Sequence, residues 1–263
     1  MTTLTLSIKT DVSGELVISP QELKNSYLFG VNIKNQQGIP FQDSNYEFYI
    51  RAAQLEVEQY LNIKLTKQIF EETIGFKHDE WRNWGYIHTT YPVVCPLQMH
   101  GYLNSYKQVS YPIEWVVSRK SSDTGLYHRA MYLVPVGGNT GISQNAVYSG
   151  IIPQLQYYNQ PEIPFYWNLA YTTGFDKVPE NILNVIGMLA SINMLYIAGD
   201  LILGTSGLAS QSLGIDGLSQ SISTTSSSGK SGYAGKIDGY VNNLKEQLPR
   251  LKDFYRGFSF TTC

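Results

Sequence analysis

The feature that most constrains the fold is a long uncharged stretch in the second half of the chain. Residues 181–199 hold no Asp, Glu, Lys or Arg, and apolar side chains fall on nearly every side of a helix drawn through them. Upstream, Thr173 and Gly174 are typical of a strand end and a turn, and Pro179 of the first position of a helix. The sequence therefore predicts one helix that is buried nearly all round.

A helix of this length raises the question of a membrane, because about 20 apolar residues span a bilayer. Three asparagines (Asn181, Asn184 and Asn193) interrupt the stretch, and no cluster of Lys or Arg flanks it. We therefore expect no membrane contact. Burial between helices of the same chain, or against a neighbouring subunit, explains the pattern better, and the second possibility would suit a ring.

Composition narrows the class of protein. The chain has 263 residues, a net charge of −2 and only 15% charged residues, against about 25% in an average soluble domain. We do not expect such a mildly acidic chain to coat DNA. A surface poor in charge, with 20 tyrosines in the chain, suits protein contacts.

The cysteines and the N-terminus indicate where the protein is made. Cys95 and Cys263 cannot form a disulfide framework, and no secretory signal is visible at the start of the sequence. We expect synthesis in a reducing cytoplasm, with Cys95 as a buried free thiol.

Two capping boxes predict early helices. Ser19–Glu22 and Ser44–Glu47 each place a serine three residues before a glutamate, so that the serine oxygen can accept a bond from the first turn. The first helix is expected to end near Gly30 and the second near Asn62. The second should bury Tyr46, Ile50, Ala53, Val57 and Leu61, and expose Arg51, Gln54, Glu56 and Glu58.

Residues 64–173 change to short runs of β-branched and aromatic residues separated by Gly, Pro, Asn and Ser. Such runs predict strands at 68–76, 84–94, 114–118, 130–136 and 164–173, with a hairpin turn at Gly137–Gly141. Proline cannot donate to a sheet ladder. The many prolines of this region therefore favour a compact sheet or small barrel over a long regular sandwich.

The segment 204–232 is rich in small residues, since 16 of its 29 residues are Gly or Ser. This composition predicts a flexible arm in isolation. The aliphatic residues Leu208, Leu213, Ile215, Leu218 and Ile222 recur through it, so it is either a plain linker or an arm that docks on a partner.

The last helix is expected from about residue 233 and carries one apolar stripe, with Pro249 kinking it or ending its first half. Between Lys230 and Arg256 there are six Lys/Arg and three Asp/Glu, which indicates a solvated face or a face toward an acidic partner. Phe258 and Phe260 alternate with smaller residues and could add to the sheet edge of another subunit.

Together these patterns predict an α+β fold: a helical core of about four helices, a large β-rich middle region and an extended Gly/Ser-rich arm. The expected parts are 1–63 (helical), 64–174 (β-rich), 175–203 (central helix), 204–232 (arm) and 233–263 (terminal helix and tail). We expect 175–263 to pack with 1–63 as one helical domain.

Catalytic patterns are missing from the sequence. The four histidines (His78, His88, His100 and His128) lie 10, 12 and 28 residues apart, and none forms the i,i+3 or i,i+4 pair of a helical metal site. We expect no catalytic residue, no metal and no cofactor, and hence no enzyme.

Several short motifs follow one another in an order that resembles the head-tail connector, or adaptor, proteins of tailed bacteriophages. They are Ala52–Leu61 (AAQLEVEQYL), Leu65–Gln68 (LTKQ), Pro92–Pro96 (PVVCP), Tyr171–Gly174 (YTTG), Val178–Ile182 (VPENI), Ser212–Ser221 and Tyr255–Gly257 (YRG). The long β-rich middle departs from the smaller adaptors.

The resemblance implies a structural virion protein at the neck, made in the host cytoplasm. It implies a homo-oligomeric ring, typically a dodecamer, that binds beneath the portal protein after genome packaging, extends the DNA channel and offers a platform to a downstream neck or tail protein. Genomic DNA would pass without specific binding. Candidate contacts to the portal or to neighbouring subunits are Leu213, Ile215, Leu218, Ile222, Tyr233, Tyr255, Arg256, Phe258 and Phe260.

An alternative stays open from the residues alone. The tyrosine-rich β region could bind a carbohydrate or a receptor, with the helices as an oligomerising base. That function would depend on tryptophans such as Trp84, Trp115 or Trp167.

Overall fold

A computed structural model describes residues 15–34, 38–79, 86–103, 106–134, 161–203, 210–215, 218–223 and 233–256. The chain divides into two compact units. A helical unit comprises Met1–Asn62 and Lys177–Cys263, and a β unit comprises Ile63–Asp176. The mixed α+β class is confirmed, with four α-helices and small antiparallel sheets in the described part of the chain.

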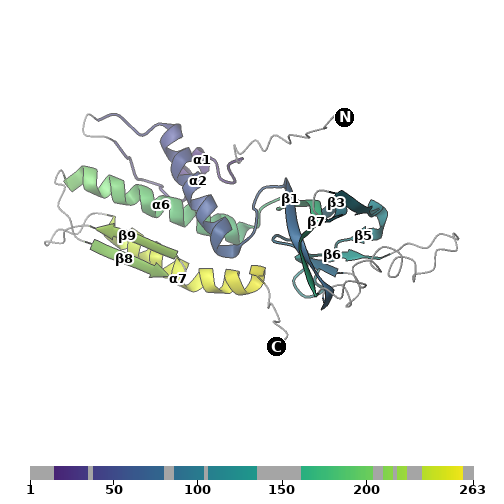
Figure 1. Ribbon diagram of the computed structural model, residues 1–263. Helices are drawn as coiled ribbons and strands as arrows, with labels where there is room; N and C mark the ends of the chain where they lie inside the picture. Colours follow the sequence, from purple (N-terminus) through teal and green to yellow (C-terminus); the bar gives the residue numbers. More distant parts are fainter. Residues whose placement is uncertain are drawn as a thin grey trace. The chain divides into compact units, whose positions relative to one another are not determined.

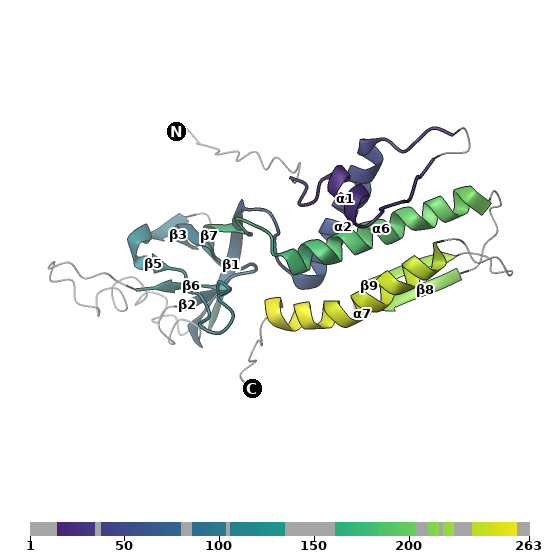
Figure 2. The same cartoon turned by 180° about the vertical axis from the view of Figure 1, so that it is seen from behind.

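Four helices make up the helical unit: α1 (Pro20–Ser26), α2 (Asp43–Leu61), α6 (Glu180–Leu203) and α7 (Ala234–Arg256). Helix α6 packs against both α2 and α7, as the two opposite views show (Figures 1 and 2). Its buried residues are Ile182, Val185, Ile186, Met188, Leu189, Ala190, Ser191, Ile192, Met194, Leu195 and Ala198. The prediction of a helix buried nearly all round is confirmed, and its cover comes from its own chain.

Segment Glu180–Gly199 is long and apolar enough to cross a membrane by length and composition, and 72% of its most apolar window is buried inside the structure. Enclosure of α6 by α2 and α7 also removes one reason for expecting a ring. A neighbouring subunit is not needed to cover this helix.

Asn184 connects α6 to Tyr27 and to helix α7. The Tyr27 hydroxyl donates to Asn184 Oδ1 at 3.2 Å, and Asn184 Nδ2 donates to Gln247 Oε1 on α7 at 3.3 Å. The Tyr240 hydroxyl of α7 donates to the Tyr27 carbonyl at 2.8 Å. Because an amide removed from water is costly without partners, these contacts explain how the half-buried Asn184 is accommodated in a predominantly apolar helix.

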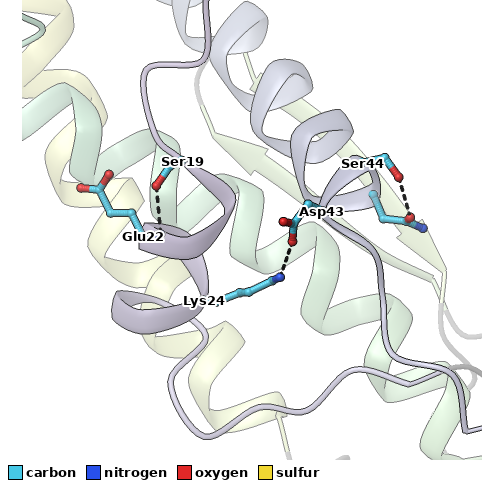
Figure 3. A network of polar contacts seen from close by, with 6 residues as sticks. Ser19, Glu22, Lys24, Asp43 and Ser44 are labelled. Atoms are coloured by element: carbon cyan, nitrogen blue, oxygen red, sulfur yellow. Dashed lines mark hydrogen bonds and ion pairs between the residues drawn. The ribbon is translucent and has the colours of Figure 1, made fainter.

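The first capping box forms as predicted on its serine side. Ser19 Oγ accepts a hydrogen bond from the Glu22 backbone N–H at 3.1 Å (Figure 3). Helix α1 ends at Ser26, earlier than the expected Gly30. An ion pair between Lys24 and Asp43, 2.5 Å long, then joins α1 to the start of α2.

The prediction of a second capping box, at Ser44–Glu47, is wrong. Helix α2 begins at Asp43, and its N-cap residue Gln42 makes no side-chain cap bond. Ser44 therefore lies inside the first turn, where its hydroxyl contacts the Asn45 side chain at 3.4 Å (Figure 3). With Ser44 as N-cap the helix would begin at Asn45, so the observed start at Asp43 is two residues too early for the serine to reach the free N–H groups.

These two serines give a direct test. We expect Ser19→Ala to lower the free energy of unfolding of the helical unit by about 1 kcal/mol, because an N-cap bond is lost. The matched change Ser44→Ala should alter it by less than about 0.5 kcal/mol, because no cap bond is involved. Urea unfolding followed by circular dichroism at 222 nm measures both, and equal losses would contradict the difference between the two helix starts.

Helix α2 buries the five predicted apolar residues, but two of its polar residues are also buried. Gln54 is 6% exposed and Glu58 is 8% exposed, so the prediction that they face solvent is wrong. Gln54 Oε1 accepts a bond from the Val17 N–H at 3.5 Å, because the segment before α1 covers this side of α2. Asn62, with φ of 52°, ends the helix in the left-handed conformation.

Two antiparallel sheets form the β unit. The larger has the order β1 (Gln68–Lys77), β7 (Glu162–Thr173), β3 (Cys95–Leu103), β4 (Tyr106–Ser110). The smaller has the order β2 (Tyr86–His88), β6 (Ala130–Leu133), β5 (Val116–Val117), with a 3-10 turn at Ile113–Trp115. Both contribute to one core of Phe76, Ile87, Val93, Met99, Tyr111, Val116, Met131, Leu133, Tyr166, Trp167, Leu169 and Tyr171.

Strands β3 and β4 were not predicted from the sequence. Proline at position 96 argued against a strand there, yet β3 includes it beside an irregularity between Pro96 and Gln98. Bulges are among the few sheet positions that tolerate proline. The expected hairpin turn at Gly137–Gly141 lies outside the described residues.

The two chain connections of the β unit run side by side. Gly174, at φ of 98°, directly follows β7, and the Phe175 N–H then donates to the Leu65 carbonyl at 3.1 Å. Lys67 and Asp176 add an ion pair of 2.7 Å. The entry and the exit of the β unit are therefore fastened to each other.

A third sheet lies between α6 and α7 in the sequence. It is a hairpin of β8 (Ser210–Ile215) and β9 (Leu218–Ser223). The sequence predicted no regular structure for this Gly/Ser-rich segment. Helix α7 follows and continues through Pro249 to Arg256, so the proline does not end it.

Candidate interaction surface

The hairpin segregates its residues by type. Its register pairs Gln211 with Ile222, Leu213 with Gln220 and Ile215 with Leu218. Since successive strand residues belong to opposite faces, one face holds Leu213, Ile215, Leu218 and Ile222 together with Gln211 and Gln220. The other holds Ser210, Ser212, Gly214, Ser219, Ser221 and Ser223. The register thus assigns four of the predicted contact residues to positions on the same face of the hairpin.

The remaining predicted contact residues differ in how exposed they are. Tyr233 is half-buried just before α7, and Arg256 is exposed at its last turn. Tyr255 is 7% exposed, and its hydroxyl donates to Asn181 Oδ1 at 3.3 Å. Its ring is thus part of the helical unit's own core and leaves little surface for a partner. Phe258 and Phe260 lie outside the described residues.

The structure buries six of the eight residues in the apolar stripe predicted for the last helix (α7), Ile237, Val241, Leu244, Leu248, Leu251 and Tyr255, and leaves Tyr233 and Tyr240 half-buried. Lys245, Arg250 and Arg256 are exposed, as are Glu246 and Asp253. The exposed part of the helix therefore carries both signs of charge. It has the character of a solvated face, one of the two interpretations left open above.

Helix α2 carries an exposed apolar strip that was not predicted from the sequence. Phe48 is 65% exposed and Leu55 is 55% exposed, and Ala52, between them, is exposed too. Positions four and three residues apart share a helix face. The spacing of these residues was a usable signal, because they fall between the buried positions of the same helix.

No group of three or more His, Cys, Asp or Glu side chains able to hold a metal ion occurs in the described part of the chain. His100 Nδ1 is 2.9 Å from Ser110 Oγ and 3.0 Å from the Met99 carbonyl, and its Nε2 is 3.3 Å from Lys107 Nζ. The Lys107 ammonium can only donate, so Nε2 of His100 accepts and Nδ1 carries the proton. Nδ1 therefore cannot accept a hydrogen bond from the Ser110 hydroxyl. Burial and the nearby Lys107 lower the pKa of His100.

The positions of the described tryptophans do not favour the alternative function, carbohydrate binding. Trp167 is 2% exposed in the β core, and Trp115 is half-buried against that core. Trp84 lies outside the described residues. The Trp167 ring cannot stack on a sugar without unpacking the core.

Cys95 is exposed, so the prediction of a buried thiol is wrong. The residue lies at the start of β3, opposite Thr172 of β7. It shares the outer face of the larger sheet with the exposed Ile69 of β1, which also pairs with Thr172.

In comparisons with known protein families and with curated proteins, the chain matches none.

Proposed function

We propose that this protein is a head-tail connector of a tailed bacteriophage, a structural virion protein that forms a ring beneath the portal. The ring would extend the DNA channel and hold a neck or tail protein. The observation that carries the proposal is the hairpin between α6 and α7, whose register collects four aliphatic residues on one face. A two-stranded hairpin needs another element against its apolar face to be stable in water, and we propose that a partner supplies it.

Further support comes from the exposed apolar strip of α2 and from the charge of the chain. Phe48 and Leu55 offer a second surface for protein contact. Each phosphate that a protein neutralises strengthens DNA binding. A net charge of −2 therefore favours passage of DNA over capture, which is what a conduit requires.

The first experiment images the full-length protein with the portal protein of the same virus. We expect rotationally symmetric rings on the portal face, and protection of residues 204–232 from protease only when portal is present. Monomers that neither bind portal nor form rings under any tested condition would contradict the proposal.

A matched pair of variants tests the hairpin face. Leu213→Ser with Ile222→Ser removes two aliphatic side chains, each contributing about 1.5 kcal/mol or more when buried, so portal affinity should fall about a hundredfold. Ser212→Ala with Ser221→Ala alters the opposite face and should change affinity less than about threefold. Binding is measured by sedimentation or interferometry, and equal effects of the two pairs would refute a contact through the apolar face.

A further inference from the structure

We infer that the β8–β9 hairpins of neighbouring copies pair edge to edge and form one continuous intermolecular sheet. This inference rests on the proposed ring, because it names the contact that joins its subunits. It concerns the strand edges, whereas the proposed contact with the portal concerns the apolar face. Each can therefore fail separately.

The first reason is the pairing of the strands. Within the described residues, β8 pairs only with β9, and this sheet contains two strands. Each strand therefore keeps one edge whose backbone N–H and C=O groups are available to another strand. Two different edges on one hairpin allow β9 of one copy to meet β8 of the next, which is the head-to-tail contact that generates rings.

The second reason is the absence of edge protection. Sheet edges are usually guarded by charged residues or proline. The edge strands of the larger sheet conform, since β1 contains Glu71, Glu72 and Lys77 and β4 contains Lys107. The sequences of β8 (SQSLGI) and β9 (LSQSIS) contain no charged residue and no proline.

The third reason identifies the partner as a second copy of the same hairpin. A strand added at either edge must continue both faces of the sheet, one of Ser and Gly and the other of Leu, Ile and Gln. Another copy supplies both faces in the same alternation. Closing such a sheet around a symmetry axis leaves no free edge.

Disulfide trapping tests the contact in the full-length chain. Cys95 and Cys263 are first replaced by serine, because Cys95 is exposed. Ser212 and Ser221 pair within one hairpin, so cysteines at both positions of one chain would react internally. The variants Ser212→Cys and Ser221→Cys are therefore made separately and mixed before assembly on portal, then oxidised.

Neighbouring strands lie about 4.8 Å apart, which is within the Cα separation that a disulfide bridges. To find the register between copies, cysteine variants at Ser210 or Ser212 in one copy are combined with cysteine variants at Ser219, Ser221 or Ser223 in the other. We expect one mixed pair to give covalent dimers. Asn242→Cys on the exposed side of α7, mixed with Ser212→Cys, is the control for random collision.

Hydrogen exchange supplies a second readout without mutation. Amides of residues 210–223 should exchange at least tenfold more slowly in assembled rings than in the free protein. Rings with no mixed cross-link and unprotected amides would overturn this inference and leave the connector function standing. Protection by portal without cross-links between copies would also overturn it, since the hairpin would then dock on portal alone. Absence of any ring would instead refute the proposed function.

Discussion

Replacing Gly174 with alanine is expected to lower the free energy of unfolding of the β unit by about 3 kcal/mol or more. Gly174 has φ of 98°, and a Cβ there would lie 2.2 Å from the Thr66 carbonyl oxygen and 2.9 Å from the Lys67 nitrogen. Both are backbone atoms of the strand connection that pairs with Phe175, so no side chain can rotate away. Strain at positive φ adds to the collision.

Gly125→Ala is the matched control for this change. Gly125 also has positive φ, 68°, but no atom lies within 4 Å of the position of its Cβ. Alanine there should lower the free energy of unfolding by about 1 to 2 kcal/mol, because a residue with a Cβ is strained in the left-handed conformation. The difference between the two variants measures the collision with Thr66.

Tryptophan fluorescence reports on this unit alone, because all four tryptophans lie between Ile63 and Asp176 (Trp81, Trp84, Trp115 and Trp167). Denaturant titration followed by fluorescence should show the shift in midpoint for Gly174→Ala. Equal midpoints for Gly174→Ala and Gly125→Ala would show that the close approach to Thr66 does not exist.

In the helical unit, Gly187→Ala is expected to cost about 3 kcal/mol. A Cβ at this position of α6 would lie 2.3 Å from the Cε2 and Cζ atoms of the Tyr27 ring. The ring can move away only by disturbing the hydrogen bond from its hydroxyl to Asn184. Overpacking costs about 1 to 3 kcal/mol, and each lost hydrogen bond adds about 1 kcal/mol.

Gly239→Ala is the matched control in a helix. No atom lies within 4 Å of its Cβ position on α7, so alanine should stabilise the unit by about 0.5 to 1 kcal/mol through its better helix propensity. Circular dichroism at 222 nm measures both variants, and the fluorescence midpoint of the β unit should stay unchanged. A neutral Gly187→Ala would show that Tyr27 does not pack on α6.

The sequence was sufficient wherever a local pattern carried the information. The uncharged stretch after Asn181 specified a buried helix, and the period of apolar residues fixed the buried sides of α2 and α7. Runs of alternating residues located β1, β6 and β7. In each case the pattern repeats over several residues, so one unusual position does not obscure it.

Single-residue signals were less reliable. Ser44 has the sequence of a cap, but Asp43 already begins the helix. Pro96 argued against β3, which tolerates it beside an irregularity. Gln54 was placed in solvent because a polar residue usually belongs there, and the remote segment at Val17 covers it.

By itself, the sequence determined the α+β class, the apolar helix, and the identity of the aliphatic residues in the Gly/Ser-rich arm. Only the tertiary structure decided that α2 and α7 enclose α6, and that Leu213, Ile215, Leu218 and Ile222 share one face. The reason is that burial and strand register depend on which distant segments meet. The same period in the sequence is compatible with cover from within the chain or from a neighbour.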